Sequence, residues 1–309
     1  KIFILISAFL VLHFSLVLLF NRLNNTRNEL VLRFNETLNI SSPYRTILAG
    51  DSHIERSIES DSIKDCFSVA YFGENNVMTF YKLNYLLEQQ VIKGTEYLIF
   101  PCDIVTYAKG LNIYRSQIGF YNKFITWSEL EKFEPNIYSS YYTYIKTIIF
   151  PYVEWQFALN TAHQNREKKS SQKLTSFSTK ERSKMVKTFV QQELMCAENK
   201  NNLFDEKALE YLVKTIELCK QYNVKPVFIK LPHTKEVFTE IENNVNPKFI
   251  TERPSEKIIT NYNIPILDFE RIFENNPELF FDVHHLNNDG KKLFTPIFEH
   301  ALDSLYRIY

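Results

Sequence analysis

Short apolar runs alternate with amphipathic helical patterns from about residue 46 to residue 309. The runs that read as strands are Thr46–Ala49, Phe67–Tyr71, Glu96–Pro101, Pro226–Leu231 and Ile264–Phe269. Patterns with helical spacing of apolar residues separate them, most clearly Asn76–Ile92 and Asp205–Tyr222. Strands that lack a polar face and are joined through helices form parallel sheets covered by helices on both sides. The sequence therefore predicts an α/β domain over 45–309 with about five parallel strands.

Composition excludes several classes of protein. Hydrophobic residues make up 45% and charged residues 23% of the chain, which is typical of a folded globular protein and not of a disordered one. The 36 basic and 36 acidic residues cancel to a formal net charge of +0. A neutral chain has no general attraction for phosphate backbones, so we expect no nucleic-acid partner.

The N-terminal stretch Ile2–Phe20 contains no formally charged residue. A helix of this length spans about 28 Å, close to the hydrocarbon thickness of a bilayer. The following Asn21-Arg22-Leu23 lacks the small residues of a signal-peptide cleavage site. We therefore expect residues 1–21 to be a transmembrane anchor that makes the protein single-pass at the cell membrane, and the polar residues 22–44 to be a tether.

The orientation of the anchor is ambiguous from charge. Lys1 precedes the apolar stretch, whereas Arg22, Arg27 and Arg33 follow it. By the positive-inside rule alone, the body of the protein would lie in the cytoplasm.

Residues 105–203 interrupt the strand–helix alternation. Their first half is rich in Tyr, Phe and Trp, and their second half is charged. Inserts in α/β proteins often lie over the C-terminal ends of the strands, where ligands bind. Two interpretations remain open: a lid or acceptor-binding surface, and a helical cap that only packs.

Cysteine and histidine spacing gives no indication of a metal centre. Cys66, Cys102, Cys196 and Cys219 have no C-x-x-C spacing, which favours buried free thiols. The seven histidines are dispersed along the chain. We expect neither a metal nor a cofactor.

Gly50-Asp51-Ser52-His53 stands between the first predicted strand and a helical pattern. The glycine suits a tight strand-to-helix turn. The Ser52 hydroxyl has two interpretations, either a helix N-cap or a nucleophile.

A second motif makes the nucleophile more plausible. The sequence FFDVHHLNNDG, which starts at Phe280, places Asp282 three residues before His285. A serine nucleophile needs an imidazole to accept its proton, and the imidazole needs a carboxylate on its other nitrogen. We therefore predict Ser52 as nucleophile, His285 as base and Asp282 as the residue that orients the base.

Together these motifs resemble those of the SGNH or GDSL-type hydrolases and acyltransferases. The resemblance implies a flavodoxin-like three-layer α/β/α sandwich, here with a helical insert and an N-terminal transmembrane helix. Gly50-Asp51-Ser52 resembles the family's first block, and Gly73 in SVAYFGENN resembles the glycine of its second block. The resemblance implies that the backbone N–H groups of Ser52 and Gly73 bind the oxyanion. His284 has no implied role.

The chain departs from the family pattern after the third predicted strand. The family carries an oxyanion-binding Asn there, whereas this chain has Cys102 and Asp103. A carboxylate would repel a developing oxyanion, and loss of one oxyanion donor costs about 100- to 1000-fold in rate. Asp103 and His233 follow predicted strands and are candidate substrate-lining residues. The acyltransferase-like branches of the family often lack this Asn.

The resemblance implies serine-dependent acyl transfer, in particular O-acetylation of a cell-surface or exported glycan through a Ser52 acyl-enzyme. It also implies an extracytoplasmic catalytic domain, against the charge signal, and a multi-span membrane acyltransferase as partner. A cell-surface carbohydrate esterase is the first alternative. The second is a catalytically inactive, glycan-binding subunit with the same fold, which the missing Asn would favour.

Overall fold

The computed structural model describes residues 2–27, 29–39, 43–103, 106–107, 124–125, 129, 172–191, 206–244 and 253–308. Contacts divide the chain into two units. The first consists of 1–39 and 113–166, and the second of 40–112 and 167–309. All the candidate site residues belong to the second unit.

The second unit contains the sheet. Its strands are β1 (Thr46–Leu48), β2 (Cys66–Ser68), β3 (Tyr97–Pro101), β4 (Lys225–Lys230) and β5 (Ile266–Asp268). Its described α-helices are α3 (Ser52–Ser57), α4 (Asn76–Glu88), α10 (Thr179–Phe189), α11 (Glu206–Gln221), α12 (Lys235–Asn244), α14 (Pro254–Asn261) and α15 (Asn288–Ile308). Short 3-10 turns are η1 (Ser60–Ser62), η4 (Leu174–Ser176) and η6 (Pro277–Leu279).

The five strands form one sheet in the order β2-β1-β3-β4-β5, and every neighbouring pair is parallel. Thr46 of β1 lies opposite Cys66 of β2 on one side and Tyr97 of β3 on the other. This is the flavodoxin-like strand order. The predicted fold class is therefore confirmed, with strand ends that differ by at most three residues from those expected.

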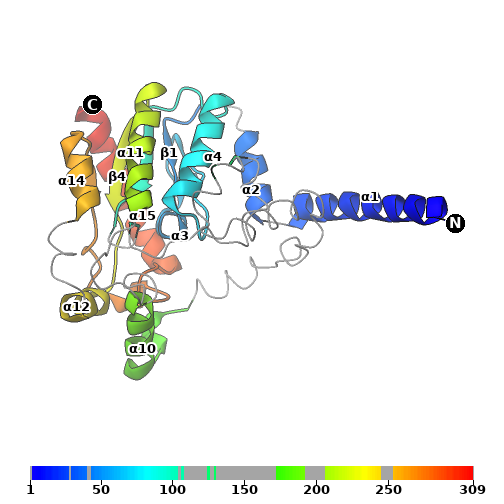
Figure 1. Ribbon diagram of the computed structural model, residues 1–309. Helices are drawn as coiled ribbons and strands as arrows, with labels where there is room; N and C mark the ends of the chain where they lie inside the picture. Colours follow the sequence, from blue (N-terminus) through cyan, green and yellow to red (C-terminus); the bar gives the residue numbers. More distant parts are fainter. Residues whose placement is uncertain are drawn as a thin grey trace. The chain divides into compact units, whose positions relative to one another are not determined.

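Helices cover both faces of the sheet (Figure 1). Helices α4, α11 and α14 line one face, and the Tyr81 and Tyr211 hydroxyls join α4 to α11 at 2.7 Å. Helices α3 and α15 lie on the other face, where Lys291 Nζ donates to the Glu55 carbonyl oxygen at 2.9 Å. The arrangement is a three-layer α/β/α sandwich.

The main hydrophobic core lies between the sheet and α15. Leu48, Ile54, Ile229, Phe294 and Phe298 are all fully buried in it. Burial of each such side chain stabilises the fold by about 1.5–3 kcal/mol. This core fixes α3 and α15 against the C-terminal halves of the strands, where the candidate site lies.

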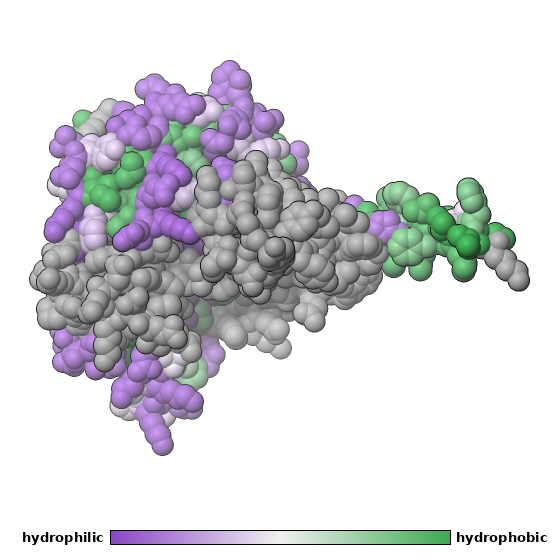
Figure 2. Space-filling view, viewed as in Figure 1, coloured by the Kyte–Doolittle hydropathy of each residue, from purple (hydrophilic) through white to green (hydrophobic). Residues whose placement is uncertain are grey.

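The first unit begins with α1 (Ile2–Arg27) and α2 (Glu29–Leu38). The stretch Ile2–Arg22 is long and apolar enough to cross a membrane, and most of its side chains are exposed, although Phe20 is buried. Its surface is almost entirely hydrophobic (Figure 2). These features agree with a single-pass N-terminal anchor. The residues expected as a tether, 22–44, are largely helical.

The predicted insert, 105–203, falls mainly outside the described residues. Its aromatic half is described only at 106–107, 124–125 and 129, so the expected lid or cap remains a prediction. Its described C-terminal part, 172–191, contains η4 and α10. Leu174, Val186 and Phe189 are buried in the main core, so this part packs as an integral piece of the second unit.

Three of the four cysteines lie within the described residues. Cys66, Cys102 and Cys219 are buried free thiols, as the sequence predicted, and Cys196 lies outside the described part. Burial raises the pKa of the Cys66 and Cys219 thiols to about 12, so both stay protonated at neutral pH.

Candidate active site

The turn from β1 to α3 requires glycine at position 50. Gly50 has φ +137°, a conformation that L side chains rarely adopt. A Cβ atom there would lie 2.6 Å from Cδ of Pro101 on the neighbouring strand. The turn can therefore bring the start of α3 directly against the end of β3.

Asp51, not Ser52, caps α3. Asp51 has extended backbone angles, and its Oδ1 accepts a hydrogen bond from the backbone N–H of His53 at 2.9 Å. Ser52 is the first residue of the helix and is 8% exposed. The capping interpretation of Ser52 is thus wrong, because Asp51 performs that function and leaves the Ser52 hydroxyl available.

Ser52, His285 and Asp282 form a hydrogen-bonded chain. Ser52 Oγ lies 2.8 Å from Nε2 of His285, and Nδ1 of His285 lies 2.9 Å from Oδ2 of Asp282. Because the carboxylate accepts from Nδ1, the neutral ring carries its proton there and presents a lone pair at Nε2 to the hydroxyl. This is the arrangement that lets an imidazole accept a proton from serine.

Backbone contacts hold the loop that carries His285. Asp282 Oδ1 accepts the N–H groups of His284 at 3.0 Å and His285 at 2.8 Å. Asn287 donates to the carbonyl oxygens of Glu278 and Phe280, and the Thr234 hydroxyl donates to that of Val283. The carboxylate therefore orients the imidazole and also folds the loop beneath it.

Burial and charge set the protonation states of the pair. Burial tends to raise the pKa of Asp282, but the neighbouring His284 and His285 outweigh it and hold that pKa well below its usual range. Burial lowers the pKa of His285, and Asp282 opposes the shift. An ionised carboxylate thus faces a neutral imidazole at neutral pH, which is the state required of a general base.

The ring that is hydrogen-bonded to Ser52 is that of His285, and His284 has other contacts. Its ring stacks on Phe189 of α10, with centroids 4.1 Å apart, and its Nδ1 lies 3.5 Å from Asp282 Oδ1. Burial keeps its pKa well below the ordinary value. Phe189 was not predicted as part of the site, because it lies in the segment assigned to the insert.

Gly73 lies in the loop after β2, on the edge of the sheet where the nucleophile turn also lies. The loop runs beside that turn, since Tyr71 N–H donates to the Gly50 carbonyl oxygen at 3.0 Å. Gly73 has φ +74°, a conformation suited to glycine. Its predicted oxyanion role stays a prediction.

A buried ion pair fixes the same loop. Lys82 of α4 contacts both oxygens of Glu74, at 2.5 and 2.7 Å, and also donates to the Val69 carbonyl oxygen. Both charged side chains are almost fully buried. Sequence reasoning missed this pair, although a lysine on an otherwise apolar helical pattern was a visible signal. Lys82 thus contacts the loop on both sides of Gly73, at Val69 and at Glu74.

Asp103 is engaged by neighbouring residues. Its Oδ1 accepts hydrogen bonds from the Thr106 hydroxyl at 3.0 Å and backbone N–H at 3.3 Å. Its Oδ2 lies 3.3 Å from Nδ1 of His53. Burial acts to raise the pKa of Asp103, but the nearby His53 outweighs it and keeps the pKa below its usual range. The carboxylate is therefore paired with His53 and Thr106, which alters the expectation that it would face the substrate.

His233 is completely buried at the end of β4. Burial lowers its pKa to about 3, so the ring is neutral at neutral pH.

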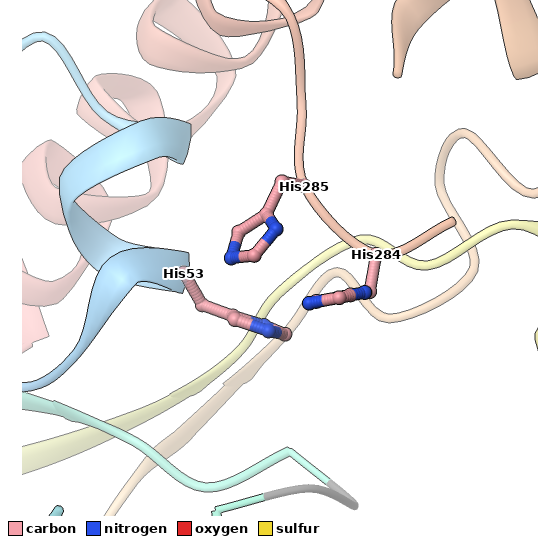
Figure 3. A group of neighbouring side chains, drawn as sticks. All are labelled: His53, His284 and His285. Atoms are coloured by element: carbon pink, nitrogen blue, oxygen red, sulfur yellow. The ribbon is translucent and has the colours of Figure 1, made fainter. Parts of the chain in front are cut away.

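Four histidine rings lie close together at the site. The ring centroid of His233 lies 5.3 Å from that of His53, and the ring centroids of His284 and His285 lie 5.0 and 4.9 Å from that of His53. Figure 3 shows the rings of His53, His284 and His285 converging from α3 and from the loop before α15. Four histidines that are dispersed in sequence thus gather in one place, contrary to the expectation from spacing.

No protein-family profile matches the chain, and no curated protein matches it. Solved structures similar to it include two from Bacteroides species. An inferred acylhydrolase from Bacteroides fragilis has 9% identity and a TM-score of 0.42, covering 88% of this chain and 94% of its own. A GDSL-like lipase from Bacteroides thetaiotaomicron has 11% identity and a TM-score of 0.43, covering 90% of this chain and 98% of its own. At these values the strand order and the site geometry, not the likenesses, carry the functional argument.

Proposed function

We propose that this protein is a serine-dependent acyl-transfer enzyme of the SGNH or GDSL type. The observation that carries the proposal is the hydrogen-bonded chain Ser52–His285–Asp282. Ser52 Oγ attacks the acyl carbonyl carbon while His285 Nε2 takes the hydroxyl proton. His285 then gives this proton to the leaving oxygen, and an ester between Ser52 and the acyl group remains.

The second half of the reaction reverses these roles. The incoming hydroxyl attacks the acyl-enzyme, its proton goes to His285, and His285 returns a proton to Ser52 as the product ester or acid leaves. Ser52 lies in the first turn of α3, where backbone N–H groups lack partners within the helix. Its N–H and that of Gly73 are the proposed donors to the tetrahedral oxyanion.

The proposed acceptor is a sugar hydroxyl of a cell-surface or exported glycan, and the transferred group is acetyl. Two considerations support this finer proposal. The apolar helix α1 is suited to anchor the enzyme at a membrane. The motifs resemble the acyltransferase-like branch, which implies an extracytoplasmic domain and a multi-span membrane acyltransferase that supplies the acyl group.

The hydrogen-bonded chain favours an enzyme over the inactive glycan-binding subunit. A subunit that only binds glycan has no need for a carboxylate, an imidazole and a hydroxyl aligned at 2.8 and 2.9 Å. A carbohydrate esterase would use the same three residues and differ only in the acceptor, because water would replace the sugar.

Labelling of the nucleophile tests the proposal. The full chain in detergent is treated with a serine-reactive fluorophosphonate, and the adduct is located by mass spectrometry. We expect labelling at Ser52, and loss of both labelling and ester turnover in Ser52→Ala. Ser304→Ala, at an exposed serine of α15, is the matched control and should behave as wild type. An unlabelled Ser52, or a Ser52→Ala variant that retains turnover, would refute the proposal.

Competition between acceptors separates the transferase from the esterase. The full chain is given a small activated acetyl ester with and without an oligosaccharide, and both released acetate and acetylated sugar are measured. The transferase proposal predicts acetylated sugar that depends on Ser52. Acetate as the sole product at every sugar concentration would favour the esterase.

A further inference from the structure

A second group of polar side chains lies beside the catalytic chain and takes no part in it. It consists of His53, Asp103 and His233, which we name the His–Asp–His cluster. All three are buried: His53 is 4%, Asp103 2% and His233 0% exposed. One potential ligand atom from each lies within 4.8 Å of the other two. The residues come from α3 and from the ends of β3 and β4, so the parallel sheet itself brings them together.

The distances suit a metal ion. Bonds of 2.0–2.1 Å to a tetrahedral zinc ion place its ligand atoms about 3.3 Å apart. Nδ1 of His53 and Oδ2 of Asp103 are 3.3 Å apart. Given the limit of 4.8 Å for the cluster, a shift of His233 by about 1.7 Å or less completes such a site.

Neighbouring groups hold the side chain of one proposed ligand and the main chain of the other two. Thr106 occupies Asp103 Oδ1 with its hydroxyl and its N–H, which directs Oδ2 toward His53. The His233 backbone N–H donates to the Glu270 carbonyl oxygen at 3.1 Å. Asp51 accepts from the His53 N–H. The Thr106 contacts fix the orientation of the Asp103 carboxylate as outer-shell contacts do in metal sites, and the two backbone hydrogen bonds hold the main chain at His233 and His53.

His233 supplies an independent observation. Among the residues that the structure describes, neither Nδ1 nor Nε2 of this buried ring has a hydrogen-bond partner. Leaving a buried polar atom unpaired costs about 1–3 kcal/mol, and such atoms call for an explanation in a native fold. A bound cation would give one of the two nitrogens its partner.

We propose that His53, Asp103 and His233 bind a divalent transition-metal ion, with zinc as the best-matched probe. Two imidazoles and a carboxylate form a borderline donor set that suits zinc better than magnesium or calcium, which prefer all-oxygen sites. Three protein ligands leave a fourth coordination position open to water or substrate.

A second trio, His53, His284 and His285, also has ligand atoms within 4.8 Å of one another. It is a weaker candidate because both ring nitrogens of His285 are engaged, one by Ser52 and the other by Asp282. Metal binding at that trio would break the catalytic chain. The His–Asp–His cluster leaves the chain intact.

The position of the cluster suggests what the ion contributes to catalysis. This suggestion rests on the proposed function. His53 follows Ser52 directly in α3, and its ring lies 4.9 Å from that of His285. A cation held there would favour negative charge that develops on the acyl oxygen. It would thereby fill the role of the oxyanion Asn that this chain lacks after β3.

Metal content and zinc binding test the proposal on the full chain in detergent. We expect close to one transition-metal ion per chain by elemental analysis. After chelation, zinc should bind again in calorimetry, and Co²⁺ should give a visible d–d spectrum. Loss of an outer-shell contact lowers metal affinity about 10- to 100-fold, so loss of a ligand should lower it by about 100-fold or more. His233→Ala and the nearly isosteric Asp103→Asn should both show this loss.

The controls separate this inference from the proposed function. His300→Ala, at an exposed histidine of α15, and Ser52→Ala should both bind zinc as wild type does. Wild-type zinc affinity in Ser52→Ala would support the site even if Ser52 proved not to be the nucleophile. Absence of zinc binding in the wild-type chain would overturn the proposal, as would unchanged affinity in folded Asp103→Asn. Loss of binding in His284→Ala with retention in Asp103→Asn would assign the ion to the other trio.

Discussion

The Ser52 hydroxyl lies 2.8 Å from Nε2 of His285, although the two residues are 233 positions apart in the chain. Local structure on each side makes the contact possible. Asp51 caps α3 and so leaves the serine free, and Asp282 accepts two backbone N–H groups of the loop that carries the imidazole. The site is thus assembled from two short pre-ordered segments at one edge of the sheet.

The cap assignment is tested by comparing Asp51→Ala with Asp51→Asn. Loss of an N-cap costs about 0.5–2 kcal/mol, whereas Asn caps about as well as Asp. We expect Asp51→Ala to lower the thermal unfolding temperature and the ester turnover, and Asp51→Asn to retain the wild-type unfolding temperature. Thermal unfolding in detergent provides the measurement. Equal losses in the two variants would contradict the cap.

Gly50→Ala should destabilise the protein more than Gly94→Ala. Both glycines have positive φ, so both substitutions introduce backbone strain of about 1–3 kcal/mol. Only at position 50 would the new Cβ overlap a neighbour, Cδ of Pro101 at 2.6 Å. At position 94 the nearest atom is 3.2 Å away. Unfolding temperatures of the two variants check this, and equal values would show that the contact with Pro101 has no energetic effect.

Lys82→Met should destabilise the protein by about 3–5 kcal/mol, because it leaves the Glu74 carboxylate buried without its cation. The double variant Lys82→Met/Glu74→Leu should recover most of this loss, since no buried charge remains. A double-mutant cycle of unfolding free energies measures the coupling. Additive effects of the two substitutions would mean that the pair does not hold the Gly73 loop.

The pH dependence of kcat/KM should report the base. His285 must be neutral to accept a proton, so activity falls as pH drops through its pKa. Because burial lowers that pKa, the acid limb should have its midpoint below the unperturbed value of about 6.5. Asp282 raises the pKa of His285, so Asp282→Asn should move the limb further toward acid and lower kcat by about 10³- to 10⁴-fold. A midpoint above 6.5 in the wild-type protein would contradict the burial argument.

Much of the fold could be read from the sequence because the signals are local. A strand without a polar face, such as β3, is visible as a continuous apolar run, and the amphipathic α11 is visible as a 3.6-residue period. The secondary structure of the expected tether, 22–44, was not predicted. Residues 29–38 form the amphipathic helix α2, whose Phe34 is buried.

The sequence by itself determined the parallel α/β fold, the apolar N-terminal helix and the two motifs that carry Ser52 and Asp282–His285, since each depends on residues close together in the chain. Only the tertiary structure decided which residue caps α3, that Lys82 reaches Glu74, and that His53, Asp103 and His233 share one buried space. In a parallel sheet the C-terminal ends of all strands meet at one edge. Residues that end different strands therefore become neighbours through topology, and no spacing in the sequence records that.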